Sequence, residues 1–294
     1  MSRNSTFGII GGDARQVYLA KSISQDGYPV FVSCLEKAEG IEELPSLSLK
    51  EISEKCGIVI LPLPATKEGK YLNTPFTDEK IELDDSFAQL FENQSVYGGM
   101  MEKLYAASEL WESIRTYDYY TREELMVGNA FLTAEAAVGL AIEEMEGALN
   151  GASCLVAGFG RIGKALCLDL RGLGAKVDCC ARKTEDLAAI RALGCEPLQY
   201  RQISKCYDVI FNTVPAKVLT ALPLSRQSRE TLVIELASFP GGVDIEAAKR
   251  LGIRVVNGQS LPGRISPKTS GEFIKEAIYN MMDANCNNKL DTPW

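Results

Sequence analysis

A glycine-rich hexapeptide is the feature of the sequence best suited to carry chemistry. The chain has the residues Gly158-Phe159-Gly160-Arg161-Ile162-Gly163 directly after the apolar run Ala152–Ala157, which predicts a buried parallel strand, and before a predicted helix. In a dinucleotide-binding loop, Gly158 permits the tight turn, Gly160 lets the backbone approach a pyrophosphate, and Gly163 lets helix and strand pack closely. The first N–H groups of the helix then bind phosphate. The motif predicts a dinucleotide site, and a structural glycine turn without nucleotide is the alternative.

Two cations follow the second predicted strand of this half, Lys176–Cys180, at the place where such folds bind the adenine ribose. Enzymes that use NAD usually have Asp or Glu there, about 20 residues after the glycine loop. This chain instead has Arg182 and Lys183, whereas Asp178 lies too early, inside the strand. Because two cations suit a 2′-phosphate, the pattern favours NADP. The alternative is that these charges are only solvated and that the enzyme takes either NADP or NAD.

Two further strand ends belong to the same predicted sheet. Their strands are predicted at Asp208–Asn212 and Leu232–Leu236. The carboxyl ends of parallel strands meet at one edge of the sheet, where the nicotinamide and its ribose are expected beside the glycine loop. Ordinary turn chemistry at a strand end is the alternative interpretation. The predicted cofactor contacts at these two ends are Asn212, Thr213, Val214, Pro215, Ala237 and Ser238.

Three cations are candidates for holding an anionic substrate. Arg15 follows Gly11-Gly12-Asp13 after a predicted strand, and an arginine can bind a carboxylate through two parallel hydrogen bonds. Arg264 and Lys268 lie in the segment Gly258–Gly271, whose content of Gly, Pro, Ser and Thr predicts a loop. The alternatives are that Asp13 only caps a helix and that the three cations face water.

The absence of histidine from the chain limits the available chemistry. It excludes Ser-His-Asp and Cys-His catalysis, and also the His-carboxylate relay used by many 2-hydroxy-acid dehydrogenases. A general acid or base must then be Lys, Asp, Glu, Tyr, Cys or water. The nine cysteines form no CxxC pair, so we predict no metal site and expect reduced, mostly buried thiols.

Composition argues against nucleic-acid and membrane partners. The net charge is −8, so a basic surface for a polyanion is not expected. The longest apolar-rich segment, Ala130–Met145, contains Glu135, Glu143 and Glu144, and no uninterrupted stretch reaches the ~20 apolar residues of a membrane span. The N-terminus is typical of a first strand and not of a signal peptide. These features predict a cytoplasmic protein.

Length and element order predict two domains. The 294 residues correspond to two domains of roughly 100–200 residues, and strands alternate with helices in both halves. We therefore expect an α/β chain of two Rossmann-like, doubly wound parallel-sheet domains joined by a long helix, which Thr121 and Glu124 begin as a capping box. A cleft between domains is the default ligand site, and the strand end Leu61–Thr66 predicts either its wall or a structural turn. The expected boundaries are 1–120 for a substrate domain, 121–147 for the helix, 148–270 for the cofactor domain and 271–294 for a C-terminal helix and tail.

Six motifs together resemble a known family. In chain order they are GGDAR, ILPLPATKEG, GFGRIGKAL, NTVPAKVL, ELASFPGGVD and LPGRISPKTSGE. Their order and spacing are similar to those of the dipicolinate synthase A-subunit family, and the resemblance extends from Phe7 to about Met282. ASFPGGVD and LPGRISPKTSG are far more specific than the glycine loop. The residues Arg264-Ile265-Ser266 depart from the pattern, because more apolar residues are expected there.

The resemblance implies an NAD(P)-dependent oxidoreductase, a dehydrogenase. The family oxidises a dihydrodipicolinate-type heterocycle to dipicolinate, which is pyridine-2,6-dicarboxylate, in a branch of the lysine and diaminopimelate pathway. It works with a second protein, the B subunit of dipicolinate synthase, in the cytoplasm of the mother cell of a sporulating bacterium. Its fold resembles that of the formate and glycerate dehydrogenase group.

The residues are compatible with this chemistry. Oxidation that creates an aromatic ring needs little acid-base help, which suits a chain without histidine. A dianionic substrate needs cationic partners, for which Arg15, Arg264 and Lys268 are the candidates, and orientation alone can contribute on the order of 7–11 kcal/mol. Lys268 or a water can move a proton. We also expect a homo-oligomer. The alternatives are another two-domain NAD(P) oxidoreductase, such as an alanine dehydrogenase type, and a non-catalytic NADP-binding partner protein.

Overall fold

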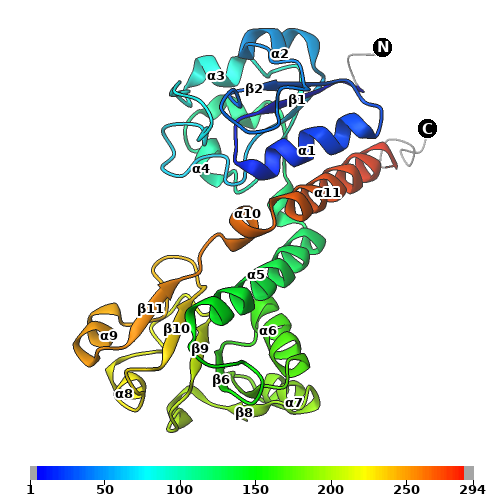
Figure 1. Cartoon of the computed structure of the whole chain (residues 1–294). Helices are drawn as coiled ribbons and strands as arrows, with labels where there is room; N and C mark the ends of the chain where they lie inside the picture. Colours follow the sequence, from blue (N-terminus) through cyan, green and yellow to red (C-terminus); the bar gives the residue numbers. More distant parts are fainter. Residues whose placement is uncertain (1–4, 288–294) are drawn as a thin grey trace. The chain divides into compact units, whose positions relative to one another are not determined.

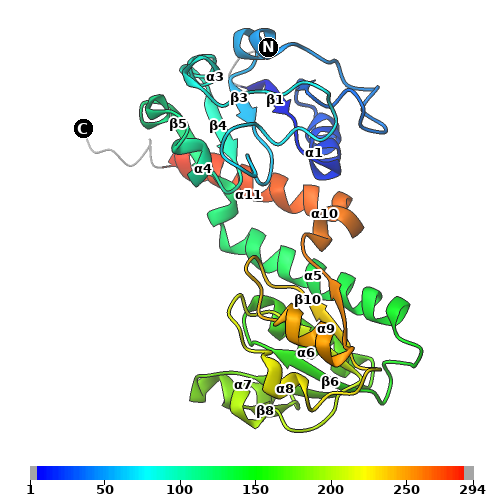
Figure 2. The same cartoon turned by 90° about the vertical axis from the view of Figure 1, so that its left-hand side faces the viewer.

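The structure is a computed structural model that describes residues 5–287, and it divides into two compact units (Figure 1). Unit 1 contains the described residues up to Gly128 and from Ser266 onward, and unit 2 contains Asn129–Ile265. In each unit, helices cover both faces of a parallel sheet (Figure 2). The chain passes from unit 1 to unit 2 within one long helix and returns directly before its last helix. These features confirm the predicted fold class.

The sheet of unit 1 has five parallel strands in the order β2-β1-β3-β4-β5. The strands are β1 (Phe7–Ile10), β2 (Val30–Ser33), β3 (Ile58–Ile60), β4 (Ser95–Gly98) and β5 (Arg115–Asp118). β1 pairs with β2 on one side and with β3 on the other, so the strand order reverses at β1. The loops after β1 and β3 therefore flank the topological switch point, where open α/β sheets bind ligands.

Helices pack on both faces of this sheet because successive strand residues point to opposite sides. The helices are α1 (Ala14–Gln25), α2 (Leu49–Lys55), α3 (Asp85–Gln89), α4 (Glu102–Tyr105) and α11 (Pro267–Asn287), with 3-10 helices at Glu109–Glu112 and Tyr119–Thr121. Ile9 belongs to the core beneath α1 and α11, which lie side by side (Figure 1). Ile10 belongs to the core beneath α2 and α3. The last helix of the chain thus completes a core that the first strand begins.

The sheet of unit 2 has six parallel strands in the order β11-β10-β9-β6-β7-β8. The strands are β6 (Ser153–Ala157), β7 (Lys176–Cys180), β8 (Glu196–Leu198), β9 (Val209–Asn212), β10 (Leu232–Glu235) and β11 (Arg254–Asn257). The strand order reverses between β6 and β9. This is the strand order of a dinucleotide-binding fold, and its switch point lies at the carboxyl ends of β6 and β9.

Both faces of the second sheet are also buried. The helices are α5 (Glu123–Glu144), α6 (Arg161–Gly172), α7 (Thr184–Ala192), α8 (Ala221–Leu224), α9 (Ile245–Leu251) and α10 (Leu261–Ile265), with a 3-10 helix at Tyr200–Gln202. Val156 packs into the core that α5, α6 and α7 cover, whereas Leu155 packs into the core that α8 and α9 cover. Gly252 ends α9 with a φ of 72°, the left-handed conformation that glycine commonly adopts after a helix.

The long helix α5 confirms the predicted connection but not its predicted start. Thr121 ends the preceding 3-10 helix, and its hydroxyl donates to the carbonyl oxygen of Asp118 at 2.7 Å, so the predicted capping box with Glu124 is wrong. The helix also passes a membrane-span test of length and composition, with a mean hydropathy of 1.6 over 18 residues. This corrects the expectation that no segment is apolar enough. Half of that window is buried inside the protein.

The segment Gly258–Gly271 is mostly helical, which contradicts the predicted loop. Leu261–Ile265 forms α10, and α11 begins at Pro267. Proline is favoured at the first position of a helix because its missing N–H has no partner there in any case. The Pro and Ser residues that suggested a loop therefore belong to helix starts. Lys268 consequently lies in the first turn of α11.

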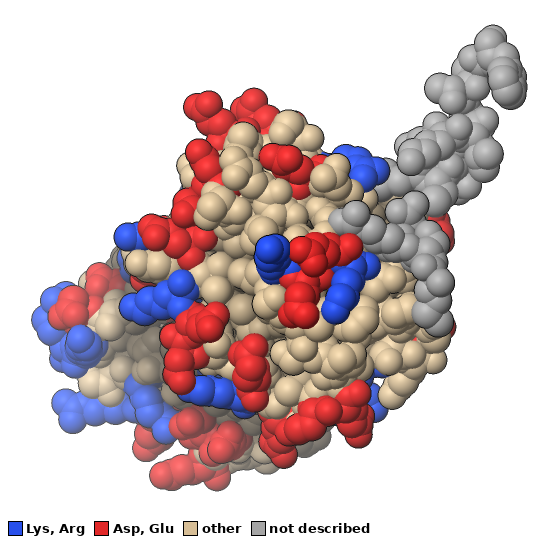
Figure 3. Space-filling model, turned by 90° about the horizontal axis from the view of Figure 1, so that it is seen from above, with Lys and Arg blue, Asp and Glu red and all other residues tan. Residues whose placement is uncertain are grey.

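The described part of the chain contains no cluster of side chains that could bind a metal ion. Of the eight cysteines whose side chains the structure describes, seven are buried and Cys206 is exposed, as expected for reduced thiols that pack as small apolar groups. No group of three or more metal-ligating side chains occurs among the described residues. On the face shown in Figure 3, acidic and basic side chains are interspersed and do not gather into one basic patch.

Candidate functional site

The glycine loop between β6 and α6 has a geometry that two of its glycines make possible. Gly158 has a φ of 115°, and a Cβ there would lie 2.3 Å from Oγ1 of Thr213. A Cβ on Gly163 would lie 2.1 Å from the carbonyl oxygen of Gly158. Real Cβ atoms do not approach other atoms so closely, so the tight turn and the contact between helix and strand both need glycine here.

The third glycine of the loop faces open space. Gly160 precedes the first residue of α6, and a Cβ built on it would meet no atom within 4 Å. No side chain caps the helix at this residue, and the first turn contains no acidic residue. The start of the 12-residue helix therefore offers N–H groups and the positive end of the helix dipole to an anion. These features fit a pyrophosphate beside Gly160.

The end of β9 is hydrogen-bonded to the residue before this loop, at the switch point. The hydroxyl of Thr213 donates to the carbonyl oxygen of Ala157 at 3.0 Å, so it lies directly behind the glycine turn. Asn212 is fully buried, and its Nδ2 donates to Glu235 at 2.6 Å and to the carbonyl oxygen of Val214 at 3.0 Å. The structure thus brings Asn212, Thr213 and Val214 next to the glycine loop.

Glu235 organises the loop after β10, a role for which we made no prediction from the sequence. Its carboxylate is buried and accepts the backbone N–H groups of Ala237 at 3.0 Å and of Gly242 and Val243 at 2.9 Å. With the Asn212 amide, four donors surround it. The only signal in the sequence is an acidic residue at the end of the otherwise apolar strand LVIE. This carboxylate fixes the loop that carries Ala237 and Ser238.

The two cations predicted near the adenine ribose are exposed directly after β7. Lys183 forms a 3.9 Å ion pair with Glu185, whereas Arg182 has neither a hydrogen bond nor an ion pair within residues 5–287. Asp178 is buried and binds Lys205 at 2.8 Å and the hydroxyl of Tyr207 at 2.7 Å. Asp178 is therefore engaged inside the unit and does not reach the strand end.

Arg15 is held in one orientation at the switch point of unit 1. Its Nε and Nη2 donate to the two carboxylate oxygens of Asp13 at 2.9 and 2.8 Å, and Nη2 also donates to the carbonyl oxygen of Leu63. Asp13 caps α1 as well, by accepting the backbone N–H of Arg15 at 3.1 Å. Burial lowers the pKa of Arg15, but the hydrogen bond and charge of Asp13 outweigh it and raise the pKa above its usual value. Arg15 is therefore a fixed, partly buried cation and not a surface charge.

The loops after β1 and β3 meet around this arginine. The side chain of Gln16 donates to the carbonyl oxygen of Leu61 at 3.0 Å, and the hydroxyl of Tyr119 donates to the same oxygen at 3.0 Å. Asn73 donates from Nδ2 to the carbonyl oxygen of Pro64 at 3.1 Å and accepts the N–H of Gly12 on its own carbonyl at 2.9 Å. The strand end Leu61–Thr66 therefore forms one wall beside the Gly11-Gly12 turn.

Asp118 is a second organising carboxylate that no sequence pattern predicted. It lies at the end of β5 and accepts the backbone N–H groups of Met100 at 3.1 Å and of Met101 and Tyr120 at 2.8 Å. Met100 has a φ of 57°, a conformation that non-glycine residues rarely adopt. The carboxylate thus stabilises the rare backbone conformation of the loop after β4. This loop lies at the same edge of the sheet as Arg15.

The three candidate substrate cations fall on different units. Arg15 and Lys268 belong to unit 1, on the adjoining helices α1 and α11. Arg264 lies in α10 and belongs to unit 2. Both Arg264 and Lys268 are exposed, and within the described chain neither has a hydrogen bond or an ion pair. Arg15 and Lys268 therefore lie on two helices of unit 1 that pack against each other, whereas Arg264 lies in the other unit.

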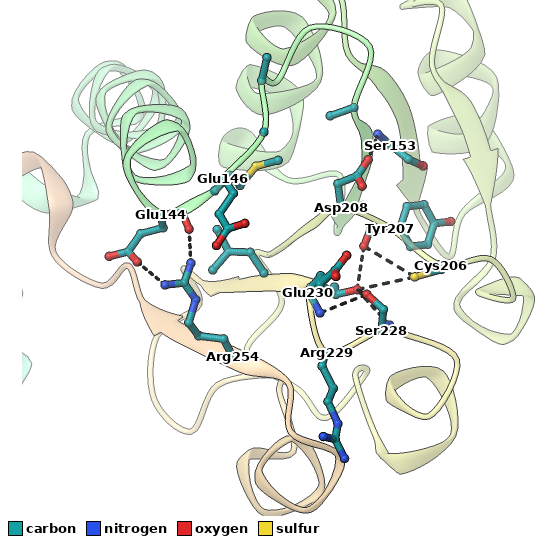
Figure 4. A pocket seen from close by; sticks show the side chains of 16 residues that line it. Glu144, Glu146, Ser153, Cys206, Tyr207, Asp208, Ser228, Arg229, Glu230 and Arg254 are labelled. Carbon is teal, nitrogen blue, oxygen red and sulfur yellow. Dashed lines mark hydrogen bonds and ion pairs between the residues drawn. The ribbon is translucent and has the colours of Figure 1, made fainter.

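One well-formed pocket lies away from this chemistry. It has a volume of about 760 Å³ and lies at the amino ends of β6, β9, β10 and β11, opposite the glycine loop (Figure 4). Arg254 in its wall donates to the carboxylate of Glu144 at 2.8 Å, and Asp208 accepts the N–H of Ser153 at 2.7 Å. Ligands of open α/β sheets bind at the carboxyl ends of the strands, so this pocket is not the predicted cofactor site.

Comparison with solved structures identifies the class of fold. D-lactate dehydrogenase from Escherichia coli superposes with a TM-score of 0.58 at 13% identity, over 96% of this chain and 97% of that one. The chain therefore has the fold of a two-domain dehydrogenase, in agreement with the glycine loop at the switch point of unit 2.

More specific relatives share nearly the whole chain. Residues 6–120 match the family described as the N-terminal domain of the dipicolinate synthase A subunit. The A subunit of dipicolinate synthase from Bacillus subtilis is 26% identical over 284 residues, which are 93% of this chain and 94% of that protein. The crystal structure of the corresponding A subunit from Bacillus halodurans has a TM-score of 0.83 at 27% identity, over 96% of this chain and 99% of that one. The chain is a relative of the dipicolinate synthase A subunit, as its motifs predict.

Proposed function

We propose that the chain is the catalytic A subunit of a dipicolinate synthase. It oxidises dihydrodipicolinate to dipicolinate with a nicotinamide dinucleotide during sporulation, in the cytoplasm of the mother cell. The similarity to the Bacillus subtilis protein over 93% of this chain supports the substrate class. The observation that carries the proposal is the glycine loop, in which two glycines are required by packing and Gly160 faces open space.

The cofactor is NADP, with NAD as the alternative. The N–H groups at the start of α6 hold the pyrophosphate beside Gly160, within the loop Gly158–Gly163. Arg182 and Lys183 bind the 2′-phosphate of NADP through charge-assisted hydrogen bonds. The nicotinamide end is bound by the strand ends that Glu235 and Asn212 fix. The residues proposed to line it are Asn212, Thr213, Val214, Pro215, Ala237 and Ser238.

The substrate is held through its two carboxylates. Arg15 has a fixed guanidinium, but Asp13 already neutralises part of its charge, so a second cation is needed for a dianion. Lys268, at the start of the adjoining α11, supplies that cation, and Arg264 is the further candidate. A bidentate arginine gives the ring a defined orientation, which is the main requirement of a reaction that needs little acid-base help.

Aromatisation of the ring removes one hydride from a ring carbon and one proton. A nicotinamide cofactor held at the strand ends of unit 2 would supply the acceptor for this hydride. A water takes the proton when Lys268 is the charged partner of the carboxylate, and Lys268 can take it only as the neutral amine. Arg15 does not take the proton, because its pKa is raised and its guanidinium keeps its own proton. Loss of water from a hydrated substrate would use the same proton acceptor.

A second protein completes the enzyme. The related proteins are named as the A subunit of dipicolinate synthase, so we propose the B subunit as the partner of this chain. We also propose that the chain is a homo-oligomer. A nucleic acid or a membrane is not part of the proposed function.

Titration calorimetry tests the cofactor part of the proposal. NADP⁺ should bind the purified chain, more tightly than NAD⁺, and pyridine-2,6-dicarboxylate should change its affinity. Gly160→Val should abolish nucleotide binding, because its side chain fills the space of the pyrophosphate. Gly147→Val is a matched control, since a Cβ at Gly147 also meets no atom within 4 Å, and it should bind normally. Equal binding by both variants would contradict the proposed site.

A further inference from the structure

Met100, in the loop after β4, combines two features that are unusual for a large apolar residue. Its φ of 57° lies in the left-handed region, and its side chain is 50% exposed. Residues other than glycine rarely adopt this backbone conformation, because it brings Cβ too close to the following carbonyl oxygen. Neither of the two cores of unit 1 includes Met100. Packing within unit 1 therefore does not account for this side chain.

Glycine occurs in the same loop, but not at the left-handed position. Gly98 and Gly99 directly precede Met100, and neither has a positive φ. A Cβ on Gly98 would lie 2.6 Å from Sδ of Met101, and a Cβ on Gly99 would lie 2.5 Å from Cδ1 of Leu63. These two glycines are needed for close packing. The position whose backbone favours glycine instead carries a large side chain.

Hydrogen bonds from the next strand keep Met100 in this conformation. The carboxylate of Asp118 accepts the backbone N–H of Met100 at 3.1 Å and that of Met101 at 2.8 Å. A rare backbone conformation persists only where the surrounding structure fixes it, and such residues cluster at ligand sites. The fixed loop therefore indicates that the side chain of Met100 has a role in binding.

A single strand end connects Met100 with the candidate substrate cation of unit 1. The backbone N–H of Ala65 donates to the carbonyl oxygen of Gly99, the residue before Met100, at 2.8 Å. Two residues before Ala65, the carbonyl oxygen of Leu63 accepts Nη2 of Arg15. The loop of Met100 and the guanidinium of Arg15 are thus both bonded to the loop after β3, at the carboxyl edge of the sheet.

We propose that Met100 packs against one face of the substrate ring while Arg15 binds a carboxylate of the same molecule. This inference rests on the proposed function, in which the substrate is a six-membered ring with two carboxylates. A charged partner recognises the carboxylates but not the ring. A thioether makes favourable contacts with an aromatic ring, and the product of the proposed reaction is aromatic. Met100 is therefore a specificity residue for the ring.

Binding of the product to the full chain tests this contact. The probe is pyridine-2,6-dicarboxylate, titrated by calorimetry with and without NADP⁺. Met100→Gly and Met100→Gln should each weaken its binding about three- to tenfold, the range of a contact between sulfur and an aromatic ring. Met100→Leu, which keeps an apolar side chain of similar size, should bind within about twofold of the wild type.

A measurement of stability separates a lost contact from a damaged fold. Met100→Gly removes the backbone strain, so its urea midpoint should equal or exceed that of the wild type even though it binds the product more weakly. Ser260→Gly is a matched control, because Ser260 also has a φ of 57° but is exposed in unit 2. It should bind the product as the wild type does.

The possible results distinguish this inference from the proposed function. If the wild type binds the product and Met100→Gly and Met100→Gln bind it equally well, the contact with Met100 is wrong and the proposed function stands. Equal losses in Met100→Leu and Met100→Gln would also overturn the inference, because the apolar character of the side chain would then not matter. A wild type that does not bind pyridine-2,6-dicarboxylate, with or without NADP⁺, overturns both.

Discussion

A Cβ on Gly271 would lie 2.8 Å from the carbonyl oxygen of Arg15, because α11 packs against the backbone of α1 at this point. The same Cβ would lie 3.1 Å from the backbone nitrogen of Leu19. Backbone atoms cannot move aside as side chains can. The motif at the start of α11 therefore supports the GGDAR motif at the start of α1, and one helix contact positions both Lys268 and Arg15.

Replacing this glycine should disturb both stability and substrate binding. Gly271→Ala should lower the free energy of unfolding by about 1–3 kcal/mol, because the added methyl group forces α11 away from α1. Urea denaturation measures this loss, and KM for the substrate should rise with it. Thr269→Ala, at an exposed residue of the same helix, should change the stability by less than about 0.5 kcal/mol. Equal stability of the two variants would contradict the close contact.

The ion pair that joins the same two helices predicts a dependence on acid. Lys275 binds Asp26 at 3.0 Å, and this bond lowers the pKa of the Asp26 carboxyl. The unfolded chain, with a pKa of about 3.9, then binds a proton more readily than the folded one. The stabilisation is present above that pH and is lost as pH falls through the lower folded value. Asp26→Asn should therefore destabilise the protein at neutral pH and lose part of the acid dependence.

Urea midpoints at several values of roughly pH 3 to 6 measure this difference. Asp283→Asn, at an exposed residue of α11, is the control and should follow the wild type. If the wild type and Asp26→Asn differ by the same amount at every pH, the ion pair has no such role.

The carboxylate that fixes the loop after β10 should be sensitive to a change of one atom. Glu235→Gln replaces an acceptor oxygen by an N–H₂ group that must face N–H donors. At least one donor is then left unpaired, which costs about 1–3 kcal/mol. Both the thermal stability and the nucleotide affinity should fall, and Glu230→Gln, on the exposed turn before β10, should change neither. Retained nucleotide affinity in Glu235→Gln would show that this loop does not contact the cofactor.

Cofactor choice depends on the cations after β7. Arg182→Ala should weaken NADP⁺ binding about 10- to 100-fold, the range of a charge-assisted hydrogen bond, and should change NAD⁺ binding little. Arg201→Ala, another exposed arginine of unit 2, is the control. Equal losses for both nucleotides would place Arg182 away from the 2′-phosphate. Calorimetric titration of each nucleotide gives these values.

Strong local patterns made most of the fold predictable. The short, mostly apolar runs at β6, β7 and β9 predict buried parallel strands. Gly158 and Gly163 are each required because a Cβ there would clash with a neighbouring atom. β5 was missed because its residues Arg115–Asp118 are polar and partly exposed at the sheet edge. α10 was missed because proline at a helix start resembles proline in a loop.

The candidate site was only partly predictable for a different reason. Arg15 was predicted as a substrate ligand from its place after a glycine turn, but its hydrogen bond to the carbonyl oxygen of Leu63 depends on a distant loop. The roles of Asp118 and Glu235 come from backbone N–H groups that converge only in the folded chain. Hydrogen bonds from a carboxylate to backbone N–H groups leave no periodic pattern in a single sequence, so they could not be predicted from it.

The central claim is that this chain oxidises a dihydrodipicolinate with a nicotinamide cofactor. The most direct measurement follows reduced nicotinamide and dipicolinate together, after dihydrodipicolinate is mixed with the purified chain and NADP⁺, with and without the B subunit. We predict that both products form in equal amounts, and that Gly160→Val forms neither while Gly147→Val forms both. A wild-type chain that binds NADP⁺ but yields no reduced cofactor, even with the B subunit present, would contradict the claim.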